Sequence, residues 1–274
     1  MQDFKQPYYT IYQRMGCAGE IYVNDVLVFS RFGENTKDSS NSSGAVPINQ
    51  ALLESGTYKI VAKMKPRYNK ETLSENEFLS LDFNVAEADS GRTKQTKTKI
   101  LPRLEQPWDG LSENINFPVF ELATEIEVKL PYVLDGWQNS LDLSILEEEI
   151  LFENVFAFYN QIYLVMESHN AGKFLELSKE KMKLQEQAFY FSEERKANFR
   201  NGAMQIFTKN LQMIPMNKEN LRIQLMGDGK LVRLVRLDGT EALKFKSPDP
   251  ENQGDIEFEV KLHMRDLKKG FSII

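Results

Sequence analysis

The 274-residue chain contains few of the side chains that most often act as bases or nucleophiles near neutral pH: two histidines and one cysteine. His263 lies in a stretch, 256–264, in which apolar and polar residues alternate, as in a strand with one buried face. The pattern puts His263 on the polar side, so we expect a solvated imidazole among charges and not a general base. We call this predicted surface the charged face; its residues are Glu257, Glu259, Lys261, His263 and Arg265.

The other two candidates also have structural explanations. His169 ends a predicted helix, where a cation complements the helix C-terminus. Cys17 lies between Gly16 and Ala18, far from either histidine in sequence, so we expect a packed thiol. The sequence lacks the nucleophile-elbow, zinc-protease, paired-cysteine and phosphate-loop motifs, and aspartates such as Asp228 have too few acidic neighbours for calcium. We therefore expect no catalytic residue, no metal and no cofactor, and a protein that is not an enzyme.

Aromatic side chains offer an alternative, which is a pocket for a small molecule. Phe158, Tyr159 and Tyr163 lie close together on one predicted helix and would line such a pocket, whereas the other interpretation makes them core residues. Trp137 and Trp108 are expected to pack against the protein, with ligand stacking as the alternative. An open cavity beside the tyrosines would favour a pocket protein, and a filled core would exclude it.

The first half of the sequence is typical of short β-strands separated by turns. The predicted strands cover residues 20–32 (as a hairpin), 57–64, 79–85, 92–100 and 117–130. Asn24-Asp25 is the hairpin turn, because these residues tolerate the backbone angles that tight hairpins need. Residues 33–44 form a mobile polar loop, and the lysines of 92–100 indicate a guarded edge strand, with a basic docking stripe as the alternative.

The order of these strands resembles the jelly-roll domains of galactose-binding type. The resemblance covers roughly residues 18–85 and is carried by Val23-Asn24-Asp25-Val26, Ile48-Asn49, Leu52-Leu53, Gly56 and the alternating strand Tyr58–Met64. It implies a β-sandwich and no particular site, because the aromatic and polar loop residues that bind sugar in such modules have no match here. Carbohydrate binding through Trp108 or a loop tyrosine is one alternative function.

The second half begins with helices and ends with strands. A helix is predicted from Ser144, with Ser144 and Glu147 as a capping box, and another over 174–191. Ser192 caps a third helix, and from Leu221 the apolar period changes to two, which predicts an antiparallel meander with one face against the helices.

Helices packed on such a meander resemble the cystatin-like cone, also known as the nuclear transport factor 2-like fold. The resemblance covers 144–274 and rests on the order of elements. That fold has a first strand between its helices, and only Ala188–Phe191 is available for it here. Some members of the fold are enzymes, but none of their functional residues can be placed on this sequence.

A composition shift over 131–144 predicts a domain boundary, with an all-β sandwich domain over 1–135 and an α+β domain over 136–274. The net charge of −6 and the short basic clusters argue against nucleic acid as a partner. No run of 18 apolar residues is present, so we expect no membrane insertion. The N-terminal residues do not look like a signal peptide, which predicts a cytoplasmic protein if the chain is complete and a periplasmic one if a leader was removed.

These observations favour a non-enzymatic binding protein that acts by protein–protein contact. One version is a bacterial immunity-type protein that neutralises a toxin, because acidic proteins often dock on basic partners. The charged face is the expected contact surface. The alternatives are a small-molecule pocket protein of the cone type and a carbohydrate-binding module.

Overall fold

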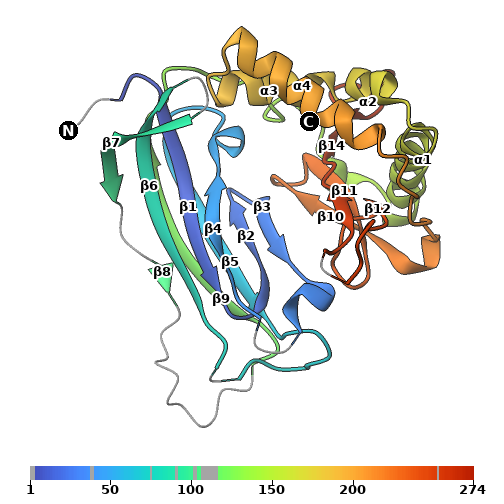
Figure 1. Cartoon of the computed structure of the whole chain (residues 1–274), viewed down its shortest axis with the longest axis horizontal. Helices are drawn as coiled ribbons and strands as arrows, with labels where there is room; N and C mark the ends of the chain where they lie inside the picture. Colours follow the sequence, from blue (N-terminus) through green and yellow to red (C-terminus); the bar gives the residue numbers. More distant parts are fainter. Residues whose placement is uncertain are drawn as a thin grey trace. The chain divides into compact units, whose positions relative to one another are not determined.

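The computed structural model (Figure 1) describes residues 4–37, 40–74, 76–89, 92–100, 104–105, 117–251 and 253–274, with the backbone alone for 92–100 and 104–105. The chain divides into two compact units. Unit 1 consists of Met1–Leu134 and Ala188–Tyr190, and unit 2 of Asp135–Gln187 and Phe191–Ile274. Antiparallel sheet predominates, and the α-helices of the described residues all lie in the C-terminal half of the chain.

Unit 1 is built from two antiparallel sheets. Its strands are β1 (Pro7–Met15), β2 (Ala18–Val23), β3 (Val26–Arg31), β4 (Ser42–Pro47), β5 (Gly56–Lys65), β6 (Leu79–Asp89), β7 (Arg92–Ile100), β8 (Leu104–Glu105) and β9 (Phe120–Val128). Two 3-10 helices, η1 (Gly33–Thr36) and η2 (Asn49–Ala51), lie in the loops. One sheet has the order β4-β1-β6-β7, with β8 also paired to β6, and the other has the order β3-β2-β5-β9.

The local sequence explains the four-stranded sheet. The predicted hairpin is confirmed as β2–β3, and its turn residues Asn24 and Asp25 have positive φ angles of 43° and 61°, as a tight hairpin turn requires. Strand β5 alternates as predicted, with Tyr58 and Ile60 buried and Lys59 exposed between them. This alternation directs one face of the sheet into the core.

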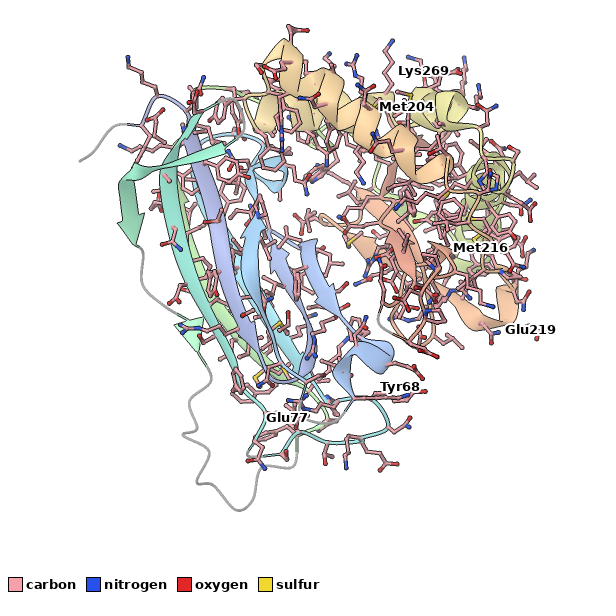
Figure 2. All side chains as sticks on the ribbon, in the orientation of Figure 1. Tyr68, Glu77, Met204, Met216, Glu219 and Lys269 are labelled. Carbon is pink, nitrogen blue, oxygen red and sulfur yellow. The ribbon has the colours of Figure 1, made fainter. Side chains whose placement is uncertain are left out.

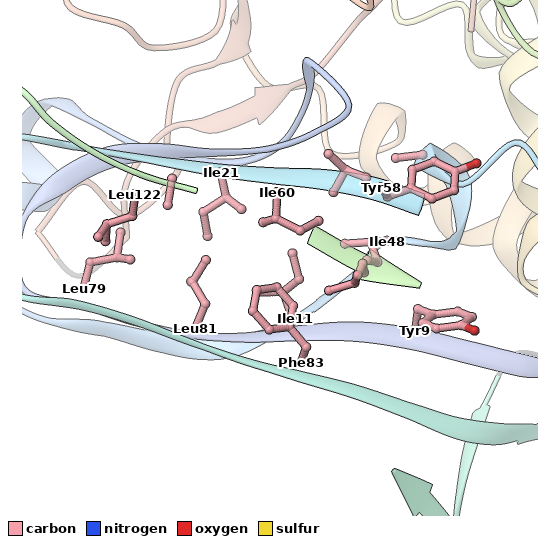
Figure 3. Close-up of a cluster of buried hydrophobic side chains, with 14 of the residues drawn as sticks. Tyr9, Ile11, Ile21, Ile48, Tyr58, Ile60, Leu79, Leu81, Phe83 and Leu122 are labelled. Atoms are coloured by element: carbon pink, nitrogen blue, oxygen red, sulfur yellow. The ribbon is translucent and has the colours of Figure 1, made fainter. Parts of the chain in front are cut away.

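The two sheets of unit 1 share one hydrophobic core (Figure 3). The residues labelled there are Tyr9, Ile11, Ile21, Ile48, Tyr58, Ile60, Leu79, Leu81, Phe83 and Leu122. Burying one such aliphatic or aromatic side chain contributes about 1.5–3 kcal/mol, so this layer is the main source of stability in the unit. Cys17 belongs to the same core with an exposure of 0%. Burial raises the pKa of its thiol to about 12, which confirms the prediction of a packed thiol. The arrangement is compatible with the predicted β-sandwich.

Two strands differ in how well the sequence indicated them. The stretch 92–100 is strand β7 at one edge of its sheet, as predicted. Strand β1 lies outside the predicted elements, although it pairs with both β4 and β6. Its outward positions carry Tyr8 and Tyr12, and its inward positions include the buried Gln13. The polar and apolar faces are therefore not distinct in the sequence.

Unit 2 combines four helices with short strands. The helices are α1 (Glu148–Glu167), α2 (Ala171–Leu177), α3 (Lys179–Ala188) and α4 (Glu193–Phe207), with 3-10 helices η3 (Leu143–Ile145) and η4 (Lys218–Asn220). The strands are β10 (Leu221–Met226), β11 (Leu231–Arg236), β12 (Leu243–Phe245), β13 (Ile256–Phe258), β14 (Leu262–His263) and β15 (Ser272–Ile273). No helix in the described ranges is long and apolar enough to span a membrane.

The helix starts follow capping chemistry only in part. Ser192 caps α4 as predicted, accepting a hydrogen bond from the Arg195 backbone N–H. The predicted capping box is wrong, because Ser144 lies in η3 and that turn is capped by Asp142. Helix α1 begins at Glu148 with no side-chain cap. Ala188–Phe191, the segment available for the first strand of the cone, is not a strand: it ends α3 and continues as a turn.

The predicted meander is divided into two sheets. One has the order β10-β11-β14-β15, and the other consists of β12 and β13. The single strand expected over 256–264 is therefore wrong. Between β13 and β14, side chains bond to the backbone carbonyls of this stretch. Lys181 donates to Glu259 O (2.7 Å), and Tyr159 donates to Val260 O (2.5 Å). These carbonyls are satisfied without a neighbouring strand, so the ladder is interrupted between β13 and β14.

Candidate functional site

The charged face does not exist as a single solvated surface. His263 has an exposure of 0%, and Lys261 is also buried. Glu257, Glu259 and Arg265 are only partly exposed, with 36%, 35% and 30% of their side-chain surfaces accessible. The prediction of a solvated imidazole is wrong. The reason is that α3 packs against the 259–265 segment and contributes Glu180 and Lys181 to its polar side chains.

Glu180 is the centre of the first polar cluster in unit 2. Arg265 donates to its Oε1 from both Nε (3.0 Å) and Nη2 (2.7 Å), and Ser272 donates to its Oε2 (3.0 Å). His263 Nε2 lies 3.2 Å from the same Oε1, outside hydrogen-bond geometry. Burial alone would raise the pKa of Glu180, but the hydrogen bond from Arg265 and the neighbouring His263 outweigh it and lower the pKa.

His263 connects this cluster to the start of unit 2. Its Nδ1 lies 2.8 Å from Ser140 Oγ, so a serine, a histidine and a glutamate follow one another in space. Burial lowers the pKa of His263, although Glu180 acts in the opposite direction. Ser140 is itself buried, and the cavity of about 440 Å³ beside Glu180 has neither Ser140 nor His263 in its wall. A nucleophile needs access to substrate, so we interpret this group as a structural connection.

A second polar cluster lies deeper in unit 2 and was not predicted. Arg233 has an exposure of 1% and donates from Nη1 to Glu241 Oε1 (2.5 Å), with Gln224 accepting from its Nε (2.9 Å). Burial raises the pKa of Glu241 to about 7 in spite of Arg233. Arg233 has two apolar residues on each side in the strand, and this apolar flank is the signal that it enters the core.

The aromatic residues proposed to line a pocket are separated by the structure. Tyr159 is 1% exposed and belongs to the core of unit 2. Phe158 contacts Phe271 edge-on, and Tyr163 donates to Glu167 on the same helix. They line neither the cavity beside Glu180 nor the one described next. The core interpretation therefore holds for Tyr159.

The tryptophan predictions have separate outcomes. A Cβ on Gly227 would lie 3.2 Å from Trp137 Nε1, so Trp137 packs against that turn as expected. Trp108 lies outside the described residues. His169 has a positive φ angle of 53° and stacks on Phe245, with ring centroids 6.2 Å apart. This packing gives His169 a structural role after α1.

Unit 1 contains a larger cavity, of about 770 Å³, between two loops at one end of its strands. We call it the loop cavity. Its wall consists of Lys37, Asn41, Arg67, Tyr68, Asn69, Lys70, Ser74, Asn76, Glu77 and Phe78. Two of these residues, Tyr68 and Glu77, are labelled in Figure 2 at the same end of the unit. The side chains are mostly polar, with Tyr68 and Phe78 as the aromatic members.

The two loops of the cavity are joined by hydrogen bonds. Thr36 is fully buried, and its hydroxyl accepts from the Tyr68 backbone N–H (2.9 Å). The Arg67 guanidinium donates to Ser40 O (2.6 Å) and to Asn41 Oδ1 (3.2 Å). Each loop therefore fixes a residue of the other, and the cavity wall has a defined shape without a ligand.

Glu77 is buried and holds the loop that contains Arg67 and Ser74 through hydrogen bonds to its backbone. It is 3% exposed, and its carboxylate accepts from the backbone N–H groups of Arg67 (3.2 Å) and Ser74 (2.5 Å). Its Oε1 also lies 3.8 Å from Arg67 Nε. Arg31 holds the other loop, which contains Asn35 and Ser40. It donates to Asn35 O (2.5 Å) and to Ser40 Oγ (2.8 Å). Buried charges bonded to the backbone thus shape both loops.

Gly16 lets the aromatic side of the cavity approach the core. Its N–H donates to Phe78 O (2.8 Å), and a Cβ at this position would lie 2.5 Å from the Phe78 ring. A side chain at this position would therefore clash with the Phe78 ring. The sequence predicted a polar loop here and suggested a loop tyrosine as a sugar ligand without choosing one. The usable signal is Tyr68, which stands between Arg67 and Asn69 in a loop rich in polar residues.

Comparisons of the chain with protein-family models, with curated proteins and with solved structures found no match. The resemblances to a galactose-binding-type jelly roll and to a cystatin-like cone therefore stay predictions. Function has to be argued from the geometry of the chain itself.

Proposed function

We propose that this protein is a non-enzymatic binding protein and that the loop cavity of unit 1 is its ligand site. The ligand is a molecule rich in hydroxyl groups, such as a carbohydrate. The observation that carries the proposal is the cavity of about 770 Å³ whose wall combines the aromatic ring of Tyr68 with the amides of Asn41, Asn69 and Asn76.

The side chains of the wall match the chemistry of a sugar. A hydroxyl group donates one hydrogen bond and accepts others, and a carboxamide offers both a donor and an acceptor in fixed geometry. The C–H face of a sugar ring is apolar and packs on an aromatic ring, which Tyr68 presents with 37% of its surface exposed. The phenol hydroxyl remains able to hydrogen-bond at the edge of the same contact.

The rigidity of the wall supports the proposal further. Weakly held loops would have to be ordered by the ligand, at a cost in affinity. Here Glu77 and Arg31 hold both loops from inside, and Thr36 fixes the backbone of Tyr68. Such preorganisation favours binding of small polar molecules, for which each hydrogen bond contributes little net free energy.

We also propose that the chain consists of two domains, a β-sandwich domain over 1–135 and an α+β domain over 136–274. The carbohydrate-binding alternative now has a named site, whereas the charged face, the contact surface expected for the toxin-neutralising alternative, is largely buried. Of that surface, Lys261 and His263 are buried, and Glu257 has only 36% of its side-chain surface exposed. A protein partner stays a prediction, and the net charge of −6 gives no reason to propose nucleic acid.

A glycan array followed by calorimetry tests the proposal. We expect binding by the full chain and a loss of up to about tenfold in affinity for Tyr68→Ala, because a stacked aromatic contact is worth about 0.5–1.5 kcal/mol. Tyr12→Ala is a matched control, since Tyr12 is 38% exposed on β1 and does not line the cavity. The proposal would be overturned by an array without hits, or by equal losses for the two variants.

A further inference from the structure

Among the described residues that line the loop cavity, cationic side chains outnumber carboxylates. The cations are Lys37, Arg67 and Lys70, and the carboxylate is Glu77. Arg67 and Glu77 form an ion pair with each other, and both are largely buried. They belong to the support of the loops. The two lysines are the remaining cations of the described wall.

The two lysines differ in what surrounds them. Lys37 Nζ donates to Glu34 Oε1 (2.7 Å) and lies 5.2 Å from the centroid of the Tyr68 ring. Lys70 is exposed and forms no ion pair with any residue that the structure describes. Of the described cations of the wall, Lys70 is the one whose charge is left for a ligand.

The backbone places Lys70 beside the binding groups of the cavity. The Lys70 N–H donates to Arg67 O (3.0 Å), which closes a tight turn over residues 67–70. Asn69 takes the left-handed conformation in this turn, with a φ angle of 60°. One turn therefore carries the aromatic ring of Tyr68, the amide of Asn69 and the ammonium of Lys70 in succession.

We infer that the loop cavity takes an acidic carbohydrate, with a carboxylate or sulfate group of the sugar placed at Lys70. This inference rests on the proposed function and deepens it. A neutral sugar that fills the cavity would remove water from the lysine without replacing it, whereas an anionic group would form a charge-assisted hydrogen bond. Lys37 contributes to the same positive potential but is already paired.

The test compares acidic and neutral glycans of the same backbone. The probes are an oligogalacturonate, a neutral oligogalactoside of equal length and a sulfated oligogalactoside, with any pair of array hits that differ in one acidic group added to the set. Calorimetry with the full chain is expected to give an affinity about tenfold higher for an acidic member than for its neutral counterpart. The preference should shrink as salt is raised, because the lysine is exposed.

Two variants separate the inference from the proposed function. Lys70→Gln should remove the preference for the acidic member and leave neutral binding within about twofold. Lys59→Gln is the control, since Lys59 is an exposed lysine on β5 outside the cavity. Circular dichroism melting of both variants checks that they are folded.

Each outcome decides between the two ideas. Equal affinity for acidic and neutral glycans, or an acidic preference that survives Lys70→Gln, overturns the inference and leaves a carbohydrate site. Binding of no glycan overturns both. If the acidic preference is present and is lost in Lys70→Gln, the inference is supported, and the carboxylate and sulfate probes identify which anion is bound.

Discussion

The two units handle buried charge in different ways. In unit 1, Arg31 and Glu77 are buried and bond mainly to backbone groups of the loops around a cavity. In unit 2, Arg233 and Glu241 are buried and bond to each other inside the core. The first arrangement shapes an open surface, and the second holds strands together. A buried charge therefore indicates a binding site only where its partners are groups that shape a surface.

The comparison also distinguishes residues that support a site from residues that can contact a ligand. Glu180 in unit 2 has a lowered pKa, several partners and a cavity beside it, which are features expected of a functional residue. Both of its oxygens are already engaged by Arg265 and Ser272. In the loop cavity Glu77 and Arg31 bond to the backbone that carries the wall, and the exposed Lys70 of the wall is left to meet a ligand. This difference can be tested by removing one buried charge from each unit.

The largest effect is expected in unit 2 for Arg233→Met. The substitution removes the cation and the hydrogen-bond donor of the buried Glu241, and breaking such a buried pair costs about 3–5 kcal/mol of unfolding free energy. Urea denaturation of the variant measures it. Arg222→Met, at an exposed position of β10, is the control and should change little. The double variant with Glu241→Met should recover most of the loss, and a loss below about 1 kcal/mol would contradict the role assigned to the pair.

The next effect concerns the pH dependence of the same unit. The folded-state pKa of Glu241 is raised to about 7 from 4.5. The unfolded state therefore loses its proton first, and stability should fall as pH rises from about 4.5 to about 7 and then level off. Relative to Glu241→Gln, this fall should amount to about 3 kcal/mol. Urea denaturation at a series of pH values measures the difference, and parallel curves for the two proteins would show that Glu241 titrates normally.

The smallest loss of stability is expected in unit 1 for Glu77→Ala, which should nevertheless have the largest effect on ligand binding. Two backbone N–H groups lose their acceptor, which costs about 1–3 kcal/mol, and the loop that carries Tyr68 is released. Calorimetry with the best array ligand should show loss of binding while the protein remains folded. Glu125→Ala, at an exposed position of β9, is the control. Unchanged affinity in Glu77→Ala would mean that the loops do not need this anchor.

The sequence was most informative where one rule decided the structure. Alternation predicted β5, the Asn24-Asp25 turn predicted the β2–β3 hairpin, and Ser192 predicted the start of α4. Each of these depends on neighbouring residues only. Strand β1 was missed because tyrosines lie on both of its faces.

The candidate site was much less accessible from the sequence. Alternation placed His263 in solvent, and only the packing of α3 shows that it is buried. The loop cavity requires Thr36, Ser40 and Asn41 to meet residues about 30 positions further along the chain. Contacts of that range are set by the pairing of strands, which local patterns do not encode. What the sequence did contain was a tyrosine among polar loop residues, without its partners.

The break in the sheet of unit 2 has a consequence for the behaviour of the protein at high concentration. Exposed strand edges recruit other chains through their free backbone groups, and this is a common route to aggregation. Between β13 and β14 the carbonyls of Glu259 and Val260 are occupied by Lys181 and Tyr159. A strand from another chain would have to displace both side chains to pair there. The interruption therefore protects an aggregation-prone segment.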